Sequence, residues 1–488
     1  MIIIATLIDS LTFGSSTYIL SKYNPSDETK PSNCTIIPLE AFRILNTLTN
    51  TSFPNAIQID SRAFSGCQSL TLQSGQFSNT LYIGTSAFAS CTSITVADFP
   101  IAIIMGTNTF ISCSSLSSVN MSNVQVVKPS AFYGCSTLPS VSFPCATSVG
   151  SSAFQDCSAL SSVYLPNALY IGGSAFKNCS ALSVVNLPKA TEIGSSAFYS
   201  CPIESLFIPN VTRIWDGAFR TDMFSSSTTI NFPNVSRWAY ISSYFLENSN
   251  LITVSLPNLQ HVNVYTFSNC INLQEVNVAA TSYISANAFK NCYSLKTIKC
   301  DNVQIIMANT FQSAYCLTEF AAPLLSTIGS SAFYHCSSLT DIFVPNVSMI
   351  STNAFCGCIE LTSINLPSVT TLGTFVFQRC TSLLSISLPN VISIGACAFS
   401  SCYALSYVSL PNVTYIGNSA FRYCYSLQSF YVLTSSVPTL GSSVFISTPM
   451  VSSGFTGTFG SIFVKSSLLT AFQSAANWSL YSARMVGQ

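Results

Sequence analysis

The stretch of sequence that decides the fold is Ala398-Phe399-Ser400-Ser401-Cys402-Tyr403-Ala404-Leu405-Ser406-Tyr407-Val408-Ser409-Leu410-Pro411-Asn412-Val413-Thr414-Tyr415-Ile416-Gly417. The pattern restarts at Ala420-Phe421, and a phenylalanine in the same place marks each repeat. Fourteen of the eighteen spacings between successive anchor phenylalanines are 22 residues, and the others are 24, 21, 26 and 24. The anchors are Phe42, Phe64, Phe88, Phe110, Phe132, Phe154, Phe176, Phe198, Phe219, Phe245, Phe267, Phe289, Phe311, Phe333, Phe355, Phe377, Phe399, Phe421 and Phe445. A fixed period of this length is typical of solenoid proteins, whose coils stack because no single coil can bury its apolar side.

One repeat contains the signals for two strands and the turns between them. The last three residues of Leu405–Leu410 alternate apolar, polar, apolar, which predicts a half-buried strand. Pro411 and Asn412 end that strand, because proline lacks a backbone donor and asparagine suits a turn. The chain re-enters the core at Val413–Ile416, and we expect Gly417 to permit a bend that needs a positive φ.

The repeat Cys-x-x-Leu-x-x-Val-x-Leu-Pro-x-Val-x-x-Ile-Gly-x-x-Ala-Phe resembles that of BspA-like leucine-rich repeats, also called the Treponema pallidum type. The resemblance covers about residues 41–445. It implies a β-rich solenoid, a right-handed leucine-rich-repeat superhelix of about 18 coils of 22 residues, with a small α/β C-terminal cap. It also implies surface proteins that bind host or matrix proteins, and the family defines no catalytic residues to carry over.

These patterns divide the chain into three parts. Residues 1–40 are expected to form an N-terminal cap or attachment segment, 41–445 the repeat array, irregular at 199–250, and 446–488 a C-terminal capping segment. In the last part we expect a strand at 461–465 and a helix through Ala476 that Ser466 or Ser467 caps. No secretory signal peptide is recognisable at the N-terminus.

The composition restricts the classes of function. Of the 488 residues only 7% are charged, where about a quarter is usual, and the formal net charge is zero. Nucleic acid is therefore not an expected partner, and neither is a membrane surface or membrane insertion. With two histidines and no nucleophile elbow, phosphate loop or paired metal ligands, we expect no enzyme, no metal and no cofactor.

The twenty cysteines follow the repeat. Fourteen of them stand three residues after an anchor phenylalanine: Cys67, Cys91, Cys113, Cys135, Cys157, Cys179, Cys201, Cys270, Cys292, Cys336, Cys358, Cys380, Cys402 and Cys424. Such a column is typical of small buried apolar residues, and its side chains would point in parallel rather than toward one another. We expect free thiols. Any disulfide or metal ligand is more plausible among Cys34, Cys145, Cys300, Cys316, Cys356 and Cys397, which lie off the column.

The outward positions of the first strand in each repeat form the predicted partner-binding surface. Aromatic side chains stand there among small polar ones, at Tyr164, Phe207, Phe343, Tyr407 and Tyr431. Such a mixture suits a protein or glycan partner. The alternative is ordinary solvent-facing residues with good β-propensity.

A second candidate is the irregular zone, where the spacing changes and the column cysteine is missing. Its interface-type residues are Arg213, Trp215, Arg220, Arg237 and Trp238. The functional interpretation is a recognition patch. The alternative is a drifted repeat in which a tryptophan fills the space of the lost cysteine.

Two functions fit these observations. The first is a non-enzymatic surface protein that mediates adhesion or binding to a protein or glycan. The second is a structural, self-assembling homo-oligomeric subunit of a fibre, appendage or phage virion. Both hypotheses place the chain on an extracellular, cell or virion surface.

Overall fold

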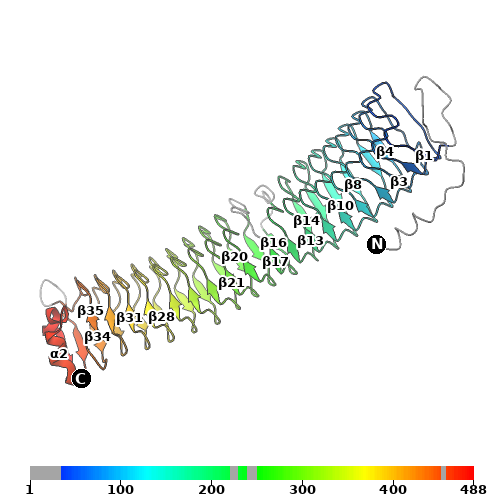
Figure 1. Ribbon diagram of the computed structural model, residues 1–488. Helices are drawn as coiled ribbons and strands as arrows, with labels where there is room; N and C mark the ends of the chain where they lie inside the picture. Colours follow the sequence, from blue (N-terminus) through cyan, green and yellow to red (C-terminus); the bar gives the residue numbers. More distant parts are fainter. Residues whose placement is uncertain (1–33, 220–228, 239–249, 452–457) are drawn as a thin grey trace. The chain divides into compact units, whose positions relative to one another are not determined.

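The computed structural model describes residues 34–219, 229–238, 250–451 and 458–488. The chain divides into two compact units, Met1–Ser225 and Ser226–Gln488. The division falls inside the irregular stretch 199–250 that the spacing of the anchors predicts. Each unit is a β-solenoid (Figure 1).

A typical coil has two short strands that lie on different sides of the solenoid. In the quoted stretch, β32 (Tyr407–Ser409) is followed by the Pro411-Asn412 turn and by β33 (Tyr415–Ile416). A longer turn containing the anchor phenylalanine then leads to the next coil. The predicted alternation is confirmed, because Val408 and Leu410 are buried and Ser409 between them is partly exposed. We call the sheet of β32 and its equivalents the long-strand face, and that of β33 and its equivalents the short-strand face.

The first unit contains strands of both faces. Its long strands are β4 (Val96–Asp98), β6 (Ser118–Asn120), β8 (Ser140–Ser142), β10 (Ser162–Tyr164), β12 (Val184–Asn186) and β14 (Ser205–Phe207). Its short strands are β1 (Ile36–Ile37), β2 (Gln58–Ile59), β3 (Tyr82–Ile83), β5 (Ile104–Met105), β7 (Val126–Val127), β9 (Ser148–Val149), β11 (Tyr170–Ile171), β13 (Glu192–Ile193) and β15 (Arg213–Ile214).

The second unit repeats the arrangement. Its long strands are β16 (Thr229–Asn231), β18 (Thr253–Ser255), β20 (Glu275–Asn277), β22 (Thr297–Lys299), β24 (Glu319–Ala321), β26 (Asp341–Phe343), β28 (Ser363–Asn365), β30 (Ser385–Ser387), β32, β34 (Ser429–Val432), β36 (Ser461–Val464) and β37 (Met485–Gly487). Its short strands are β17 (Arg237–Trp238), β19 (His261–Val262), β21 (Tyr283–Ile284), β23 (Ile305–Ile306), β25 (Thr327–Ile328), β27 (Met349–Ile350), β29 (Thr371–Leu372), β31 (Ser393–Ile394), β33 and β35 (Thr439–Leu440).

Strands of successive coils pair in parallel and in register with the repeat. Val163 of β10, for example, pairs with Val141 of β8 on one side and with Val185 of β12 on the other. Each inward side chain therefore packs on its own equivalents, and all three valines are buried. The solenoid of stacked coils predicted from the period is confirmed, and its strands pair in parallel.

The anchor phenylalanines stack into a ladder in the core. The ring of Phe399 lies between those of Phe377 and Phe421, with centroid distances of 5.4 Å and 5.1 Å and interplanar angles of 12° and 6°. All three rings are fully buried. Offset stacking of this kind adds to the burial of apolar surface, so the ladder joins each coil to both neighbours.

The glycine after the short strand has a different role from the predicted one. Gly417 does not have a positive φ; a Cβ atom on it would lie 2.6 Å from the backbone nitrogen of Ala396 in the preceding coil. The glycine is needed because two backbones approach closely there. The left-handed conformation occurs instead two and six residues later, at Ser419 (φ 55°) and Tyr423 (φ 63°).

The cysteine column is buried, and its thiols make hydrogen bonds that the sequence did not reveal. In thirteen coils the cysteine Sγ donates to the carbonyl oxygen of the anchor phenylalanine in the preceding coil at 2.9–3.3 Å, as Cys402 does to Phe377 at 3.1 Å. A buried carbonyl needs its partners, and the thiol is small enough to supply one there. All twenty cysteines are free.

The C-terminal segment covers the last coil. It contains β36, the 3-10 turn η1 (Ser466–Leu468), helix α2 (Leu469–Ser474), the 3-10 helix η2 (Trp478–Arg484) and β37. Trp478 is fully buried, and its Nε1 donates to the carbonyl of Pro438 at 2.8 Å. The expected serine cap is wrong, because Ser466 begins the 3-10 turn and Leu468, without a side-chain cap bond, precedes α2.

We expect Phe399→Ala to lower the free energy of unfolding by about 3–5 kcal/mol, because it leaves a cavity inside the ladder. Phe343→Ala is the matched control, since that ring is 57% exposed in the same unit. Urea denaturation followed by circular dichroism measures both variants. Equal midpoints for the two would contradict the role of the ladder.

The burial of the column also predicts a pattern of thiol reactivity. Burial raises the pKa of Cys157 to about 12, and the thiolate is the form that reacts with iodoacetamide. Cys145 and Cys316 are exposed. In the native chain at mildly alkaline pH, mass spectrometry should find these two alkylated and Cys157 protected until urea is added. Equally fast alkylation of Cys157 without urea would contradict its position in the core.

Candidate functional site

The outward positions of the long-strand face stand in columns because the strands are in register. In the second unit Ser385 pairs with Tyr407, and Ser409 pairs with Tyr431. The first and third residues of each strand therefore form two neighbouring columns, and the middle residue points into the core. This geometry places the predicted surface residues on one side of each unit.

In the first unit the predicted aromatic residues are exposed but separated. Tyr164 and Phe207 are 53% and 52% exposed and occupy the same column. Asn186 stands between them, paired with Tyr164 on one side and with Phe207 on the other. The two positions are therefore two strands apart, about 9.6 Å along the sheet at the usual strand spacing.

Phe343 of the second unit is also exposed. It stands at the end of β26, in register with Ala321 of β24. The neighbouring column places Asp341 opposite Glu319, so this part of the face carries negative charge. Phe343 is thus an exposed ring in an acidic neighbourhood.

Tyr407 and Tyr431 belong to a cluster of three rings. Their ring centroids lie 5.3 Å apart, and Tyr431 stacks on Phe463 at 4.4 Å with an interplanar angle of 16°. Tyr407 is 46% exposed, and the other two rings are half-buried. The row continues to Val486 of β37, which pairs with Phe463. We call Tyr407, Tyr431 and Phe463 the aromatic platform.

The sequence did not reveal Phe463 as a member of this surface. It lies after the last anchor phenylalanine, in the part that was predicted to be a cap. The signal that was available is the alternation in Ser461-Ile462-Phe463-Val464, which places Phe463 on the same side as Ser461. Its pairing with Tyr431 extends the repeat face beyond the repeats.

A hollow of about 400 Å³ adjoins the aromatic platform on the same face. Strands β30 and β32 and the turns after them line it: Ser385, Ile386, Ser387, Leu388, Pro389, Tyr407, Ser409 and Pro411. Tyr407 belongs both to the hollow and to the platform. The volume is in the range of small-ligand sites, so a partner can place one group in the hollow and another on the rings.

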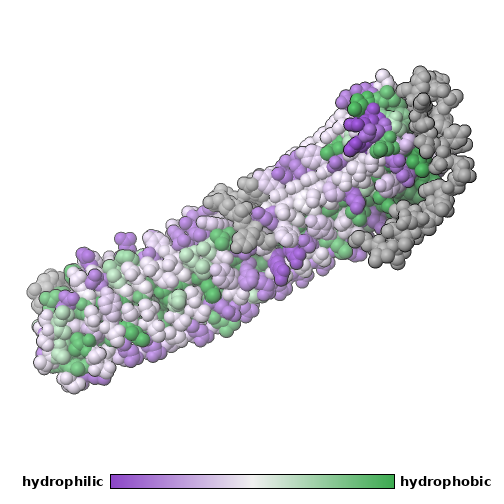
Figure 2. All heavy atoms as spheres, in the orientation of Figure 1, coloured by the Kyte–Doolittle hydropathy of each residue, from purple (hydrophilic) through white to green (hydrophobic). Residues whose placement is uncertain are grey.

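This part of the surface carries very little charge. Between Ser363 and Phe463 the sequence has two charged residues, Arg379 and Arg422. Both lie in the turns that hold the anchor phenylalanines, and the Arg422 Nη2 donates to the Tyr423 hydroxyl at 2.7 Å. Figure 2 shows the visible face of the second unit as mainly of intermediate hydropathy, with scattered hydrophobic and hydrophilic side chains.

The residues predicted in the irregular zone divide between the units. Arg213 and Trp215 lie in the first unit, where Trp215 Nε1 donates to Glu192 Oε1 at 2.5 Å and Arg213 Nη1 lies 3.6 Å from Glu192 Oε2. The guanidinium also lies 5.8 Å from the centre of the Trp215 ring. Trp215 remains 39% exposed, so these three side chains form a small, ordered surface cluster.

The other irregular-zone residues lie differently. Trp238 is 4% exposed and packs near Phe232, with ring centroids 6.1 Å apart, so it belongs to the core of the second unit rather than to its surface. Trp238 is the inward residue of β17, the position that Ile214 and Val262 hold in β15 and β19, so its burial is that of a core strand residue and does not show a tryptophan in the space of a lost cysteine. Arg237 is exposed, and Arg220 lies outside the described residues.

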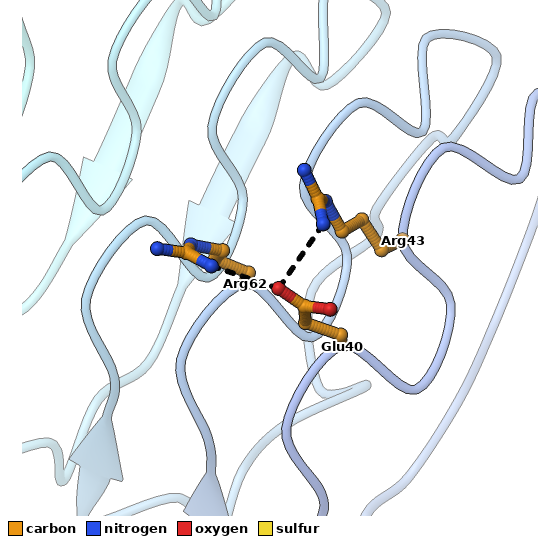
Figure 3. Close-up of polar contacts among 3 residues, drawn as sticks. All are labelled: Glu40, Arg43 and Arg62. Atoms are coloured by element: carbon orange, nitrogen blue, oxygen red, sulfur yellow. Dashed lines mark hydrogen bonds and ion pairs between the residues drawn. The ribbon is translucent and has the colours of Figure 1, made fainter.

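The first unit has a charged cluster of its own near its N-terminal end. Both Arg43 and Arg62 reach Glu40 Oε1, at 3.2 Å and 2.8 Å (Figure 3). The hydrogen bond from Arg62, together with Arg43, holds the pKa of Glu40 below its ordinary value. These side chains are exposed, so we interpret the cluster as a surface ion pair that ties two coils together.

Within the described ranges no group of three or more His, Cys, Asp or Glu side chains is arranged to hold a metal ion. No described helix has the length and apolar character needed to cross a membrane.

Comparison with known proteins agrees with the geometry of the coils. The family model for the BspA type leucine rich repeat region (6 copies) matches residues 16–123, 103–225, 191–318, 239–361 and 326–452. No curated protein matches the chain.

Several solved structures are similar. A leucine-rich repeat protein from Bacteroides ovatus is 21% identical over 84% of this chain and 92% of its own, with a TM-score of 0.41. A leucine rich cell surface protein from Faecalibacterium prausnitzii is 22% identical over 74% of this chain and 83% of its own, with a TM-score of 0.26. The T. pallidum leucine rich repeat protein is 18% identical over 46% and 78%, with a TM-score of 0.19. Since the family model spans most of the repeat array, the chain belongs to the BspA-type leucine-rich repeat family.

Proposed function

We propose that this chain is a non-enzymatic binding protein of an extracellular surface, and that the long-strand face of its second unit holds a protein or glycan partner. The observation that carries the proposal is the aromatic platform of Tyr407, Tyr431 and Phe463 beside a hollow on an otherwise small-residue face. Membership of the BspA-type family supports binding or adhesion in general.

The platform can supply binding energy because the Tyr407 ring is 46% exposed, the Tyr431 and Phe463 rings are partly exposed, and the three already pack on one another. Burial of apolar surface contributes about 25 cal/mol per Å². Since Tyr407 stacks near Tyr431 and Tyr431 stacks on Phe463, little side-chain freedom is left to lose when a partner binds. Rigid aromatic anchors of this kind are the usual hot spots of interfaces.

The chemistry of the hollow favours binding over catalysis. Its lining consists of serine, proline, aliphatic and tyrosine side chains. The lining residues include no histidine, carboxylate or lysine side chain, and these are the groups that most often carry general acid–base catalysis. The BspA-type family likewise supplies scaffolds rather than catalytic residues.

Other exposed residues are proposed as secondary contacts. Tyr164 and Phe207 on the long-strand face of the first unit, and Phe343 in the second, can each contact an extended partner. The cluster of Arg213 and Trp215 is a further candidate in the first unit. The fibre or virion subunit has no support from the comparisons, and we do not propose it.

The double variant Tyr407→Ala/Tyr431→Ala tests the proposal. We expect the dissociation constant of the partner to be about tenfold or more higher for this variant than for the unchanged chain, because two aromatic anchors are lost. The test screens the full chain on arrays of matrix proteins and of glycans, and then measures the dissociation constant by biolayer interferometry for each partner found.

The matched control is Tyr403→Ala/Tyr425→Ala. These rings are 44% and 48% exposed and stack at 5.2 Å, but they lie in the turns before β32 and β34 rather than on the face. The control should bind as the unchanged chain does. Equal losses for both variants, or none for either, would count against the long-strand face as the site.

A further inference from the structure

We propose that the partner of this face is a neutral carbohydrate, bound by the aromatic platform and by the hydroxyl groups of the adjoining hollow. The inference rests on the proposed function and names the class of partner. It depends on three observations. The long strands β28 to β36 carry no charged side chains, the rings of the aromatic platform lie beside the hollow, and the serine hydroxyl groups of the hollow make no side-chain hydrogen bond within the described residues.

The strands that form this surface have no charged side chains. In β28, β30, β32, β34 and β36 the outward residues are serine, asparagine, tyrosine and phenylalanine. A partner with carboxylates, sulfates or ammonium groups would lose water there without gaining an opposite charge. A neutral partner has no such cost. Elsewhere in the unit the same columns do carry charge, as at Asp341 and Lys299, so neutrality is a property of these coils.

The hydroxyl groups of the hollow are available for a ligand. Ser385, Ser387 and Ser409 make no side-chain hydrogen bond within the described residues, and the first two are exposed. Beside the short strand β33 of the same coil, by contrast, the Thr414 hydroxyl is engaged, because it donates to the carbonyl of Ile392 at 3.2 Å. A free serine hydroxyl both donates and accepts, as do the hydroxyl groups of a sugar.

The platform complements the other side of a sugar ring. A sugar presents C–H groups on one face, and these are attracted to the negative face of an aromatic ring. Tyr407 lies where platform and hollow meet, so one sugar unit can stack on a ring while its hydroxyl groups reach Ser385 or Ser409. Stacking together with uncharged hydrogen bonding therefore favours carbohydrate over an ionic partner.

The repeat also provides length. From β28 to β36 five strands lie side by side, about 4.8 Å apart, which gives a neutral strip about 19 Å long. Ser363 and Asn365 continue the polar columns beyond the hollow. A strip of this length suits several consecutive sugar units, so we infer a polysaccharide or oligosaccharide rather than a single monosaccharide.

The test uses the full chain on a glycan microarray, followed by isothermal titration with soluble β-glucan, mannan and xyloglucan as neutral probes. Heparin and polysialic acid are the anionic probes, and fibronectin is the protein probe. We expect saturable binding to at least one neutral polysaccharide, with the same affinity at low and high sodium chloride, because no ion pairs form.

Three double variants locate the binding. Tyr407→Ala/Tyr431→Ala should weaken it at least tenfold, whereas Tyr403→Ala/Tyr425→Ala should leave it unchanged. Ser385→Ala/Ser387→Ala should weaken it severalfold with an unchanged unfolding midpoint, because both serines are exposed and the change removes only hydroxyl groups.

The outcomes distinguish this inference from the proposed function. Binding of fibronectin or another protein that depends on Tyr407 and Tyr431, without binding of any neutral glycan, would overturn the carbohydrate inference and leave the proposed function standing. Binding only of the anionic probes, lost at high salt, would overturn it as well. If no partner of any class depends on these tyrosines, both proposals fail.

Discussion

The structure depends on one constraint: no coil can cover its own apolar side, so each must be covered by the coils before and after it. Phe399 shows this directly, because its ring is enclosed by the equivalent rings of Phe377 and Phe421. The close stacking of coils also explains Gly417, because the backbone of the preceding coil leaves no room for a Cβ atom there. Inward positions are therefore held to a strict repeat, whereas outward positions are free to vary from coil to coil.

This constraint explains how much of the fold could be predicted. The strand of Tyr407–Ser409 and the turn at Pro411 follow from local alternation and turn chemistry, and the stacking of coils follows from the period. The role of Gly417 could not be predicted, because its space is limited by the preceding coil rather than by its own conformation. The acceptor of the Cys402 thiol likewise lies 25 residues earlier in the chain, so only the assembled coils reveal the bond.

The candidate site could be predicted in part for the same reason. Tyr407 and Tyr431 stand at repeat positions that face outward, so the period places both on one surface. Phe463 follows the last repeat, and only the pairing of β34 with β36 brings it onto that surface. The hollow forms because the small side chains of Ser385 and Ser387 in one coil lie beside the large side chain of Tyr407 in the next. It therefore depends on two neighbouring coils and cannot be predicted from one repeat. Trp238 was predicted to lie on the surface, but its ring is buried in the core. The irregular spacing of the anchors there did not allow inward and outward positions to be assigned.

The separation of inward and outward positions has a consequence for recognition. A charged surface attracts its partner over a distance and loses that advantage as salt screens it. The strands from β28 to β36 have no charged side chains that could attract a partner over a distance. Their selectivity therefore depends on direct contact, in which a sugar ring stacks on an aromatic ring and sugar hydroxyls bond to serine hydroxyls. Single contacts of this kind are weak. A solenoid compensates because successive coils present similar groups at a fixed spacing, and a repeating partner can engage several of them at once, each contact raising the effective concentration for the next.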